Sequence, residues 1–278
     1  MPEPTESRDG LERLVRLLDL EQVDRDIFRG ANRRDDAPGR VFGGQVASQA
    51  LRAAAATVDA AHRVNSLHAY FLRPGRHGSP IVYTVDRIRD GSSFTTRRVV
   101  AVQQGEPILN LDASFHKDEP GHEFQLPSPV ADAPPPETLE RNRHQHGPHQ
   151  RPIDMRDVVP PVSPLATRAH WVRADGALPD DPVLHACVVT YFSDSGPVGA
   201  ARRAIGGWER DGGPRMMTAS LDHCLWFHRP VRADEWLYYE LEAVACTNAR
   251  GLARGEMWTQ DGTLAVTVTQ ESLLRPLA

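Results

Sequence analysis

Two stretches of this chain, 66–75 and 220–231, carry nearly the same letters. The first reads SLHAYFLRPG and the second SLDHCLWFHRPV, so that Arg73-Pro74 matches Arg229-Pro230 at an offset of 156 residues (229 − 73). Keeping this offset without a gap aligns further identical residues, which are Phe71 with Phe227, Tyr83 with Tyr239, Arg98 with Arg254 and Gln104 with Gln260. A repeat that stays in register over this distance predicts two similar modules in one chain.

The order of expected elements is similar in the two halves. An amphipathic helix is predicted over 11–20, and a second helix follows the Gly43-Gly44 pair in a run rich in Ala, Leu and Gln. Alternating apolar and polar residues then predict an antiparallel meander, with strands over 80–90, 94–104 and 107–116.

The second half again places a helix before a meander. The apolar run 180–194 predicts a buried helix, and Asp261-Gly262 predicts a hairpin turn. The strands expected in this half are 216–230, 236–246, 252–260 and 264–274. We therefore expect an α+β fold of two modules, in each of which a sheet wraps a helix and gains by pairing its edge with its twin.

The two expected modules are separated by a stretch rich in Pro, His and charged residues. This divides the chain into an N-terminal module (1–117), a linker or long surface loop (118–165) and a C-terminal module (166–278). His144, His146 and His149 lie in the linker, but no acidic or Cys partner stands at ligand spacing. A solvated linker is the preferred interpretation, and we expect no metal.

Composition excludes several classes of protein. The formal net charge is −5 and no dense Lys/Arg run occurs, so we expect no binding to nucleic acid. No apolar stretch approaches the ~18 residues that a membrane helix needs. Three cysteines without CxxC spacing predict free thiols in a reducing compartment, and the N-terminus does not read as a signal peptide. The expected location is cytoplasmic.

Several long motifs, in order, resemble a known family. The stretches RVFGGQVASQAL, HAYFLRPG, RDGSSFTTRRV, ASLDHCLWFHRP and RGEMWTQDGTLAVTVTQE together are similar to the acyl-CoA thioesterase II family, the double-hotdog thioesterases. The resemblance runs from about residue 11 to 275 and is interrupted by the linker. It implies a double hotdog fold, an acyl-CoA substrate, hydrolysis to a free fatty acid and CoA without a cofactor, and homo-oligomers.

The resemblance also implies a site, because the family uses an Asp, a Thr or Ser, and a Gln to bind and activate water. Carried over by motif, these are Asp194 of YFSD, Ser220 two positions before Asp222-His223, and Gln270 of TVTQES. Serine keeps the hydroxyl of a threonine but loses the branch that stiffens χ1. A thioester carbonyl is electrophilic enough that an Asp with neutral partners can suffice as the base.

At the repeat offset, the first half lacks this polar set. Gln270 corresponds to Ser114 and Ser220 corresponds to Val64. The second module is therefore expected to carry the catalytic residues, and the first to supply fold and part of the acyl and CoA pocket.

Two other functions stay open from the sequence. A hotdog acyl-CoA hydratase or dehydratase would use a His with a carboxylate, for which His68, or His223 with Asp222, are the candidates. A non-catalytic acyl-CoA-binding protein would bind ligand without turnover. No G-x-S-x-G elbow or complete phosphate-binding loop occurs, so neither an α/β-hydrolase triad nor a P-loop is indicated.

Two further sets of residues are candidates for substrate contacts. Arg73, Arg98 and Arg229 carry charges that can meet CoA phosphates or pair with surface carboxylates. Gly43 and Gly44 precede a helix whose N-terminal N–H groups can face a carbonyl oxygen.

Overall fold

Two helices occupy the centre of the molecule, one from each half of the chain. The computed structural model describes residues 4–32, 40–142, 152–207 and 212–277. Helix α2 (Gly43–Ala55) is built from small and straight-chain residues that favour helix, and it ends before a β-branched pair at Thr57 and Val58. Helix α3 (Pro182–Ser193) begins with a proline in its first turn, and ten of its residues are buried. Both predicted helices are confirmed.

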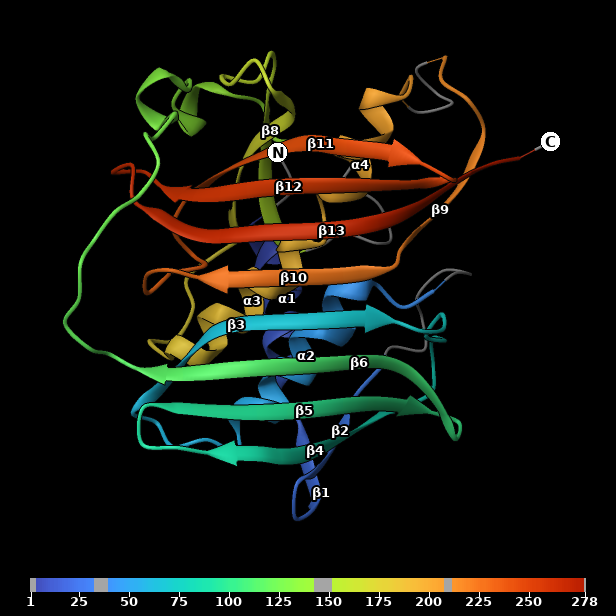
Figure 1. Ribbon diagram of the computed structural model, residues 1–278, viewed down its shortest axis with the longest axis vertical. Helices are drawn as coiled ribbons and strands as arrows, with labels where there is room; N and C mark the ends of the chain where they lie inside the picture. Colours follow the sequence, from blue (N-terminus) through green and yellow to red (C-terminus); the bar gives the residue numbers. More distant parts are fainter. Residues whose placement is uncertain (1–3, 33–39, 143–151, 208–211, 278) are drawn as a thin grey trace.

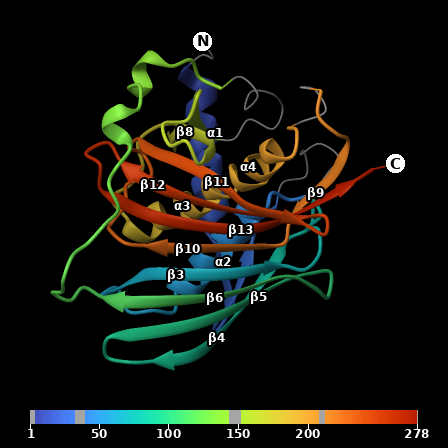
Figure 2. The same cartoon turned by 45° about the horizontal axis from the view of Figure 1, so that its top comes forward.

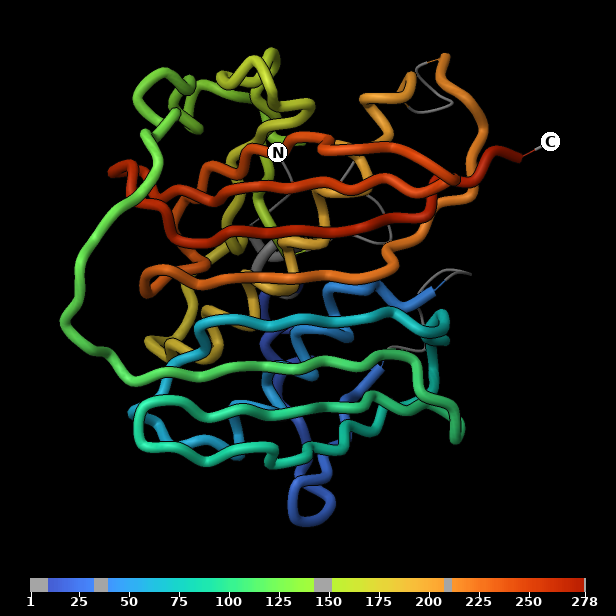
Figure 3. The backbone as a smooth tube through the Cα atoms, in the orientation of Figure 1, coloured from blue at the N-terminus to red at the C-terminus, as the bar shows by residue number. Residues whose placement is uncertain are grey.

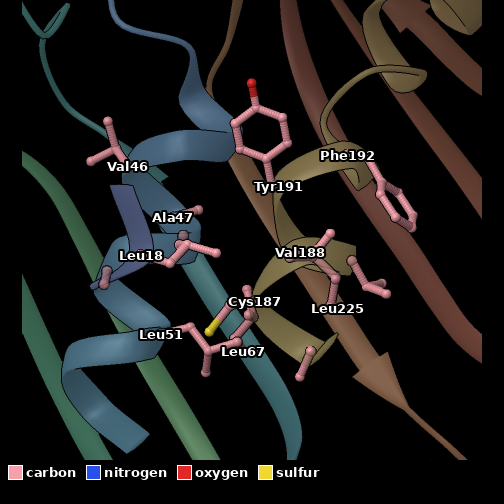
Figure 4. Packing of buried hydrophobic residues seen from close by; sticks show 14 of the residues in the cluster. Leu18, Val46, Ala47, Leu51, Leu67, Cys187, Val188, Tyr191, Phe192 and Leu225 are labelled. Atoms are coloured by element: carbon pink, nitrogen blue, oxygen red, sulfur yellow. The ribbon is translucent and has the colours of Figure 1, made fainter. Parts of the chain in front are cut away.

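The two central helices run antiparallel, side by side (Figure 4). At one end the Gly44 N–H of α2 donates to Asp194, the residue at which α3 ends. At the other end Arg52 of α2 forms an ion pair with Asp181, the residue before α3, at 3.1 Å. The small residues of α2 allow this close approach, since a Cβ added at Gly44 would collide with the carbonyl oxygen of Tyr191.

Strands from both halves form one continuous antiparallel sheet, which covers the central helices on one side (Figures 1 and 2). Its strand order is β1-β2-β4-β5-β6-β3-β10-β13-β12-β11-β8-β7, and β9 pairs with β13 beside this path. The halves join where β3 pairs with β10, with Leu67 opposite Leu225. Each module therefore covers an edge of its twin, as expected from the repeat.

The strands of the first half are β1 (Glu21–Asp24), β2 (Ile27–Gly30), β3 (His62–Phe71), β4 (Ile81–Asp90), β5 (Phe94–Gln103) and β6 (Glu106–Lys117). Those of the second half are β7 (Ile153–Val158), β8 (Ala166–Ala174), β9 (Met216–Ser220), β10 (Asp222–Phe227), β11 (Leu237–Thr247), β12 (Arg250–Thr259) and β13 (Leu264–Pro276). The expected single strand over 216–230 is thus two strands, which separate at Leu221. The expected turn at Asp261-Gly262 is confirmed, and Gly262 takes a positive φ of 83° there.

The repeat is visible in the element positions. Strands β4 and β11 begin 156 residues apart (237 − 81), as do β5 and β12 (250 − 94). The helices α2 and α3 begin only 139 residues apart (182 − 43). The difference arises because the second half inserts helix α4 (Pro197–Ala204) and a further loop between its long helix and its first meander strand.

The stretch expected to be a linker contains regular structure. Two short 3-10 helices, η1 (Val130–Asp132) and η2 (Pro136–Thr138), follow a segment that passes along the strand ends from β6 (Figure 3). Strand β7 lies within 118–165 and pairs with β8, so this part is sheet and not loop. The division of the chain at 117 and 165 stays a prediction, and His144, His146 and His149 lie outside the described residues.

A single apolar core joins both halves. Helix α1 (Pro4–Leu18) packs its predicted face, with Leu11, Leu14 and Leu18, into the same cluster as α2, α3 and the inner face of the sheet. Figure 4 shows Leu51 and Leu67 of the first half beside Cys187 of α3, and Leu225 beside Val188. This shared core fixes the ends of α2 and α3 relative to each other.

We expect the approach of α2 to α3 to depend on Gly44. In Gly44→Ala the new methyl group meets backbone that cannot move away, and overpacking of this kind costs about 1–3 kcal/mol. The melting temperature in differential scanning fluorimetry should fall by several degrees. Gly121→Ala is the matched control, because a Cβ there meets no atom within 4 Å. Equal melting temperatures for the two variants would contradict the close approach.

Candidate active site

A cavity of about 650 Å³ opens where the N-terminus of α2 meets the C-terminus of α3. Its walls come from both halves of the chain, including the loop before α2, the end of β3, the start of α4 and strand β9. The described residues that line it are Arg40, Val41, Phe42, Gly43, Val46, Phe71, Leu72, Arg73, Pro74, Gly75, Ile108, Arg168, Asp194, Ser195, Val198, Gly199, Thr218, Ala219, Ser220 and Leu221.

Asp194 lines this cavity at the point where α3 ends. Its side chain is held by both halves: Oδ2 accepts the Gly44 N–H at 2.9 Å, and Oδ1 accepts the Ser220 hydroxyl at 2.9 Å. The residue is 9% exposed, so the carboxylate is buried apart from its contact with the cavity. Charge-assisted hydrogen bonds of this kind hold a buried carboxylate in one orientation.

Ser220 and Gln270 extend this hydrogen-bonded chain into the sheet. Gln270 on β13 is fully buried, and its Nε2 donates to Ser220 Oγ at 3.0 Å and to Ser272 Oγ at 3.3 Å. Ser220 is the last residue of β9, and β10 begins at Asp222, after the break at Leu221. The structure therefore brings together the three residues selected from the sequence, from α3, β9 and β13.

The N-terminus of α2 forms the opposite wall of the site. Phe42 precedes the helix and has no polar side-chain atom, so it cannot cap the first N–H groups. Asp194 takes the Gly44 N–H instead, at the positive end of the helix dipole. Gly43 leaves the space in front of the carboxylate open: a Cβ there would lie 2.8 Å from Asp194 Oδ2 and 3.0 Å from the Phe71 ring. The expected group facing the α2 N–H is a carbonyl oxygen, whereas the structure places a carboxylate there.

The equivalent junction, where the N-terminus of α3 meets the C-terminus of α2, is closed. The N-terminal N–H groups of α3, at Val183 and Leu184, are capped by Asp181 Oδ1 at 2.9 and 3.2 Å. Helix α2 ends at Ala55, whereas helix α3 is followed by Asp194. Beyond it, the buried guanidinium of Arg97 donates to the carbonyl and hydroxyl oxygens of Thr57, so this corner is filled by the protein itself.

The histidines considered for a hydratase do not face the cavity, and neither is among the described residues that line it. His68 is exposed on β3 and packs edge-on against Trp226, at 5.1 Å between ring centroids, on the outer face of the sheet. His223 is fully buried behind Ser193, and Asp222 precedes it on β10 and accepts the Glu271 N–H. Successive strand residues point to opposite faces, so Asp222 and His223 do not form a catalytic pair.

Among the arginines selected from the sequence, Arg73 lines the cavity. It is half-exposed, donates to the Pro107 carbonyl at 2.9 Å and pairs with Glu106. Arg98 pairs with Asp112 and Arg229 pairs with Glu123, both away from the cavity.

Sequence reasoning missed two arginines of the lining, Arg40 and Arg168. Arg40 stands directly before the segment that enters α2, and Arg168 on β8 donates to the Ser195 carbonyl beside Asp194. Arg40 is the first residue of the RVFGG motif, which was the signal that could have selected it from the sequence. The position of Arg168 close to the YFSD motif becomes apparent only in the folded structure.

The cysteines are free thiols, as expected from their spacing. Burial raises the pKa of Cys187 to about 12 and that of Cys224 to about 11, so neither is a ready nucleophile near neutral pH. Within the described residues no group of three or more His, Cys, Asp or Glu is arranged to hold a metal ion, and no helix there is long and apolar enough to cross a membrane.

Comparison with known proteins gives matches over both halves. A family model described as acyl-CoA thioesterase matches residues 148–273, and one described as acyl-CoA thioesterase N-terminal domain matches residues 33–116. The acyl-coenzyme A thioesterase 8 of Homo sapiens is 39% identical, over 93% of this chain and 88% of its own.

Solved structures agree with this. The acyl-CoA thioesterase II TesB2 of Mycobacterium marinum has a TM-score of 0.82 at 40% identity, with 95% of this chain and 99% of that chain covered. A protein with a hot dog fold from Alicyclobacillus acidocaldarius reaches a TM-score of 0.76 at 19% identity, covering 96% and 99% of the two chains. The tandem hotdog fold expected from the sequence is confirmed.

We expect Gly43 to determine the position of the Asp194 carboxylate. In Gly43→Ala the methyl group reaches a side-chain oxygen, which can rotate away, so the fold should survive while the hydrogen bond from Gly44 is lost. A crystal structure of the variant should show the carboxylate turned away from α2, with a melting temperature close to that of the wild type. If the Asp194 carboxylate keeps its wild-type position in Gly43→Ala, then the absence of a side chain at Gly43 does not determine that position.

Proposed function

The chain belongs to the acyl-CoA thioesterase II family, and we propose that it hydrolyses fatty acyl-CoA to free fatty acid and CoA by direct attack of a water molecule held by Asp194, Ser220 and Gln270. The observation that carries this proposal is the hydrogen-bonded chain from Gln270 through Ser220 to Asp194, which ends at the cavity. Each carboxylate oxygen accepts one protein hydrogen bond and keeps further lone-pair capacity for a water molecule.

In the proposed reaction Asp194 acts as a general base. A water proton passes to the carboxylate as the water oxygen attacks the thioester carbon, which forms a tetrahedral oxyanion. The C–S bond then breaks, and the departing thiolate takes the proton from Asp194. The carboxylate is restored, and the products are the acid and the CoA thiol.

Ser220 and Gln270 keep Asp194 in its reactive orientation. The Ser220 hydroxyl donates to Asp194 and so must accept the Gln270 N–H, which fixes the direction of both bonds. The N-terminus of α2 supplies positive potential next to the reacting carbonyl, and positive potential stabilises charge that develops on its oxygen.

The cavity walls suit the two ends of an acyl-CoA. Apolar side chains suited to an acyl chain include Val46, Phe71 and Val198. Arg40 and Arg73 line the same cavity, and Arg73 is half-exposed. We assign these two arginines to the phosphates of CoA, which arginine binds well.

We also propose that the chain forms homo-oligomers. The face of the sheet opposite the central helices carries Tyr70 on β3, which is 63% exposed and lies two residues from His68, whose ring contacts Trp226. Exposed aromatic side chains on such a face favour burial against another subunit. Multi-angle light scattering should give a mass that is a multiple of that of one chain.

Asp194→Asn tests the proposed base. The amide keeps the shape of the side chain but cannot accept a proton, so kcat for thiol release should fall by about 10²- to 10⁴-fold, the range of general base catalysis. Release of CoA from short, medium and long acyl-CoAs is followed with a thiol reagent. Asp112→Asn, on the exposed surface, is the matched control and should leave kcat unchanged.

A wild-type protein that binds acyl-CoA but releases no thiol would instead support the binding-protein alternative. An Asp194→Asn variant with full activity would overturn the assignment of the base. Ser220→Thr should keep activity and Ser220→Ala should lose it, since the hydroxyl is the group that bridges Gln270 and Asp194.

Arg73→Gln tests the phosphate assignment. Loss of the charge should raise KM for an acyl-CoA by about tenfold, which corresponds to about 1.4 kcal/mol of binding free energy. KM for the same acyl group on N-acetylcysteamine, which has no phosphates, should not change. Arg98→Gln is the control, because its partner Asp112 lies on the surface. Equal effects on both thioesters would place Arg73 outside the CoA site.

A further inference from the structure

His223 is a fully buried histidine that the proposed reaction does not use. It lies on β10, and its Nε2 is 2.7 Å from the Ser193 hydroxyl, one residue before Asp194. The same hydroxyl lies 2.9 Å from the Thr190 carbonyl oxygen. A hydroxyl has one proton, so Ser193 either donates to Thr190 and accepts from His223, or donates to His223. The tautomer of the imidazole decides between these two arrangements.

Two buried polar atoms in this part of the structure have no hydrogen-bond partner among the described residues. They are His223 Nδ1 and Gln270 Oε1. The other end of the Gln270 amide is satisfied, because Nε2 donates to Ser220 and to Ser272. Leaving a buried polar atom without a partner costs free energy, so the two orphan atoms call for one explanation.

The two orphan atoms belong to side chains on neighbouring strands. His223 on β10 and Gln270 on β13 lie one position beyond the cross-strand pair of Cys224 and Thr269. Burial lowers the pKa of the His223 imidazole, while the Asp194 charge and the Gln270 side chain act to raise it. The amide oxygen is the accepting end of Gln270, and its amide nitrogen is engaged elsewhere.

The tautomer follows from this arrangement. With the proton on Nε2, Nδ1 would turn a lone pair toward another acceptor, Gln270 Oε1, and both would stay unsatisfied. With the proton on Nδ1, a small turn of either side chain lets the ring donate to Oε1, and Nε2 accepts the Ser193 hydroxyl, so both orphan atoms gain a partner.

We propose that His223, as its neutral Nδ1–H tautomer, is a positioning residue that sets the orientation of the Gln270 amide. The inference rests on the proposed role of Gln270. A glutamine amide can turn over with little change of shape, and a flipped amide would turn Oε1 toward Ser220 and compete with Asp194 for its hydroxyl proton. His223 supplies a donor on the other side, and a flipped amide would then place N–H against N–H.

The result is one directed chain of hydrogen bonds. It runs from the Ser193 hydroxyl through His223, Gln270 and Ser220 to the Asp194 carboxylate, with each donor pointing the same way; the bond from His223 to Gln270 is the inferred link between the contacts that the structure shows. Bonds aligned in this manner polarise one another. The first and last residues of this series of hydrogen bonds, Ser193 and Asp194, are neighbours at the end of α3. A shift of Ser193 is therefore transmitted to Asp194 both through the backbone and through the hydrogen bonds to its side chain.

The first test measures the tautomer in the wild-type protein. Long-range ¹H–¹⁵N correlation spectra of protein labelled with ¹⁵N-histidine at neutral pH identify which ring nitrogen carries the proton. We expect the proton of His223 on Nδ1. A proton on Nε2, or on both nitrogens, would overturn the proposal, since Nε2 must accept from Ser193.

The second test separates positioning from packing. In His223→Asn the amide nitrogen lies near the Nδ1 position and can still donate to Gln270, whereas in His223→Gln the amide lies near Nε2 and reaches Ser193 instead. We expect His223→Gln to lower kcat by about 10- to 100-fold, as loss of an orienting partner does. KM should not change, and His223→Asn should retain most of kcat.

If His223 acted only through packing, His223→Gln should keep more of kcat than His223→Asn, because Gln is closer to His in volume. That result, or an equal loss of kcat in both variants, would overturn the proposal. Addition of His223→Gln to Gln270→Ala should produce no further loss of kcat. If Gln270→Ala alone leaves kcat unchanged, the proposed catalytic set has failed, and the tautomer measurement still tests the hydrogen-bond arrangement by itself.

Discussion

The structure depends on the antiparallel contact between α2 and α3. Each helix comes from a different half of the chain, and the Gly44 N–H of one reaches the Asp194 carboxylate at the end of the other. The contact needs a residue without a side chain, because a Cβ at Gly44 would collide with the backbone of α3. It also needs the continuous sheet, since the pairing of β3 with β10 and the common core hold the helix ends at this separation. Neither half alone contains both sides of the candidate site.

A duplicated architecture offers two equivalent helix junctions, and local chemistry leaves one of them open. At the α2 N-terminus the capping position holds Phe42, so the Gly44 N–H is available to Asp194. At the α3 N-terminus Asp181, the residue directly before the helix, caps it and pairs with Arg52. The N-cap residue, which is Phe42 at α2 and Asp181 at α3, therefore decides which junction can hold a carboxylate from the other half. The polar chain behind Asp194 completes this asymmetry.

Much of the fold followed from periodicity, because alternation and helix-forming runs are local properties of the chain. The in-register repeat predicted two modules with paired edges, and the motif resemblance selected Asp194, Ser220 and Gln270, which the structure places within hydrogen-bonding distance of one another. Strand β7 was hidden in a stretch rich in Pro and charge, and its pairing with β8 is a tertiary effect. The bond from Gly44 to Asp194 spans 150 residues, and no local pattern encodes such a contact. The role of Asp181 as a cap was readable in principle, because an Asp before a Pro at a helix start is a typical capping signal.

We infer that each chain binds one acyl-CoA, with its thioester at the junction of the two halves. A crystal structure with a thioether analogue of an acyl-CoA, which cannot be hydrolysed, tests this most directly. We expect one molecule per chain, with the sulfur and the adjacent carbon in the cavity beside the Asp194 carboxylate, and with the phosphates near Arg40 and Arg73. An analogue seated at the α3 N-terminus near Asp181, or one with its sulfur away from Asp194, would contradict the account.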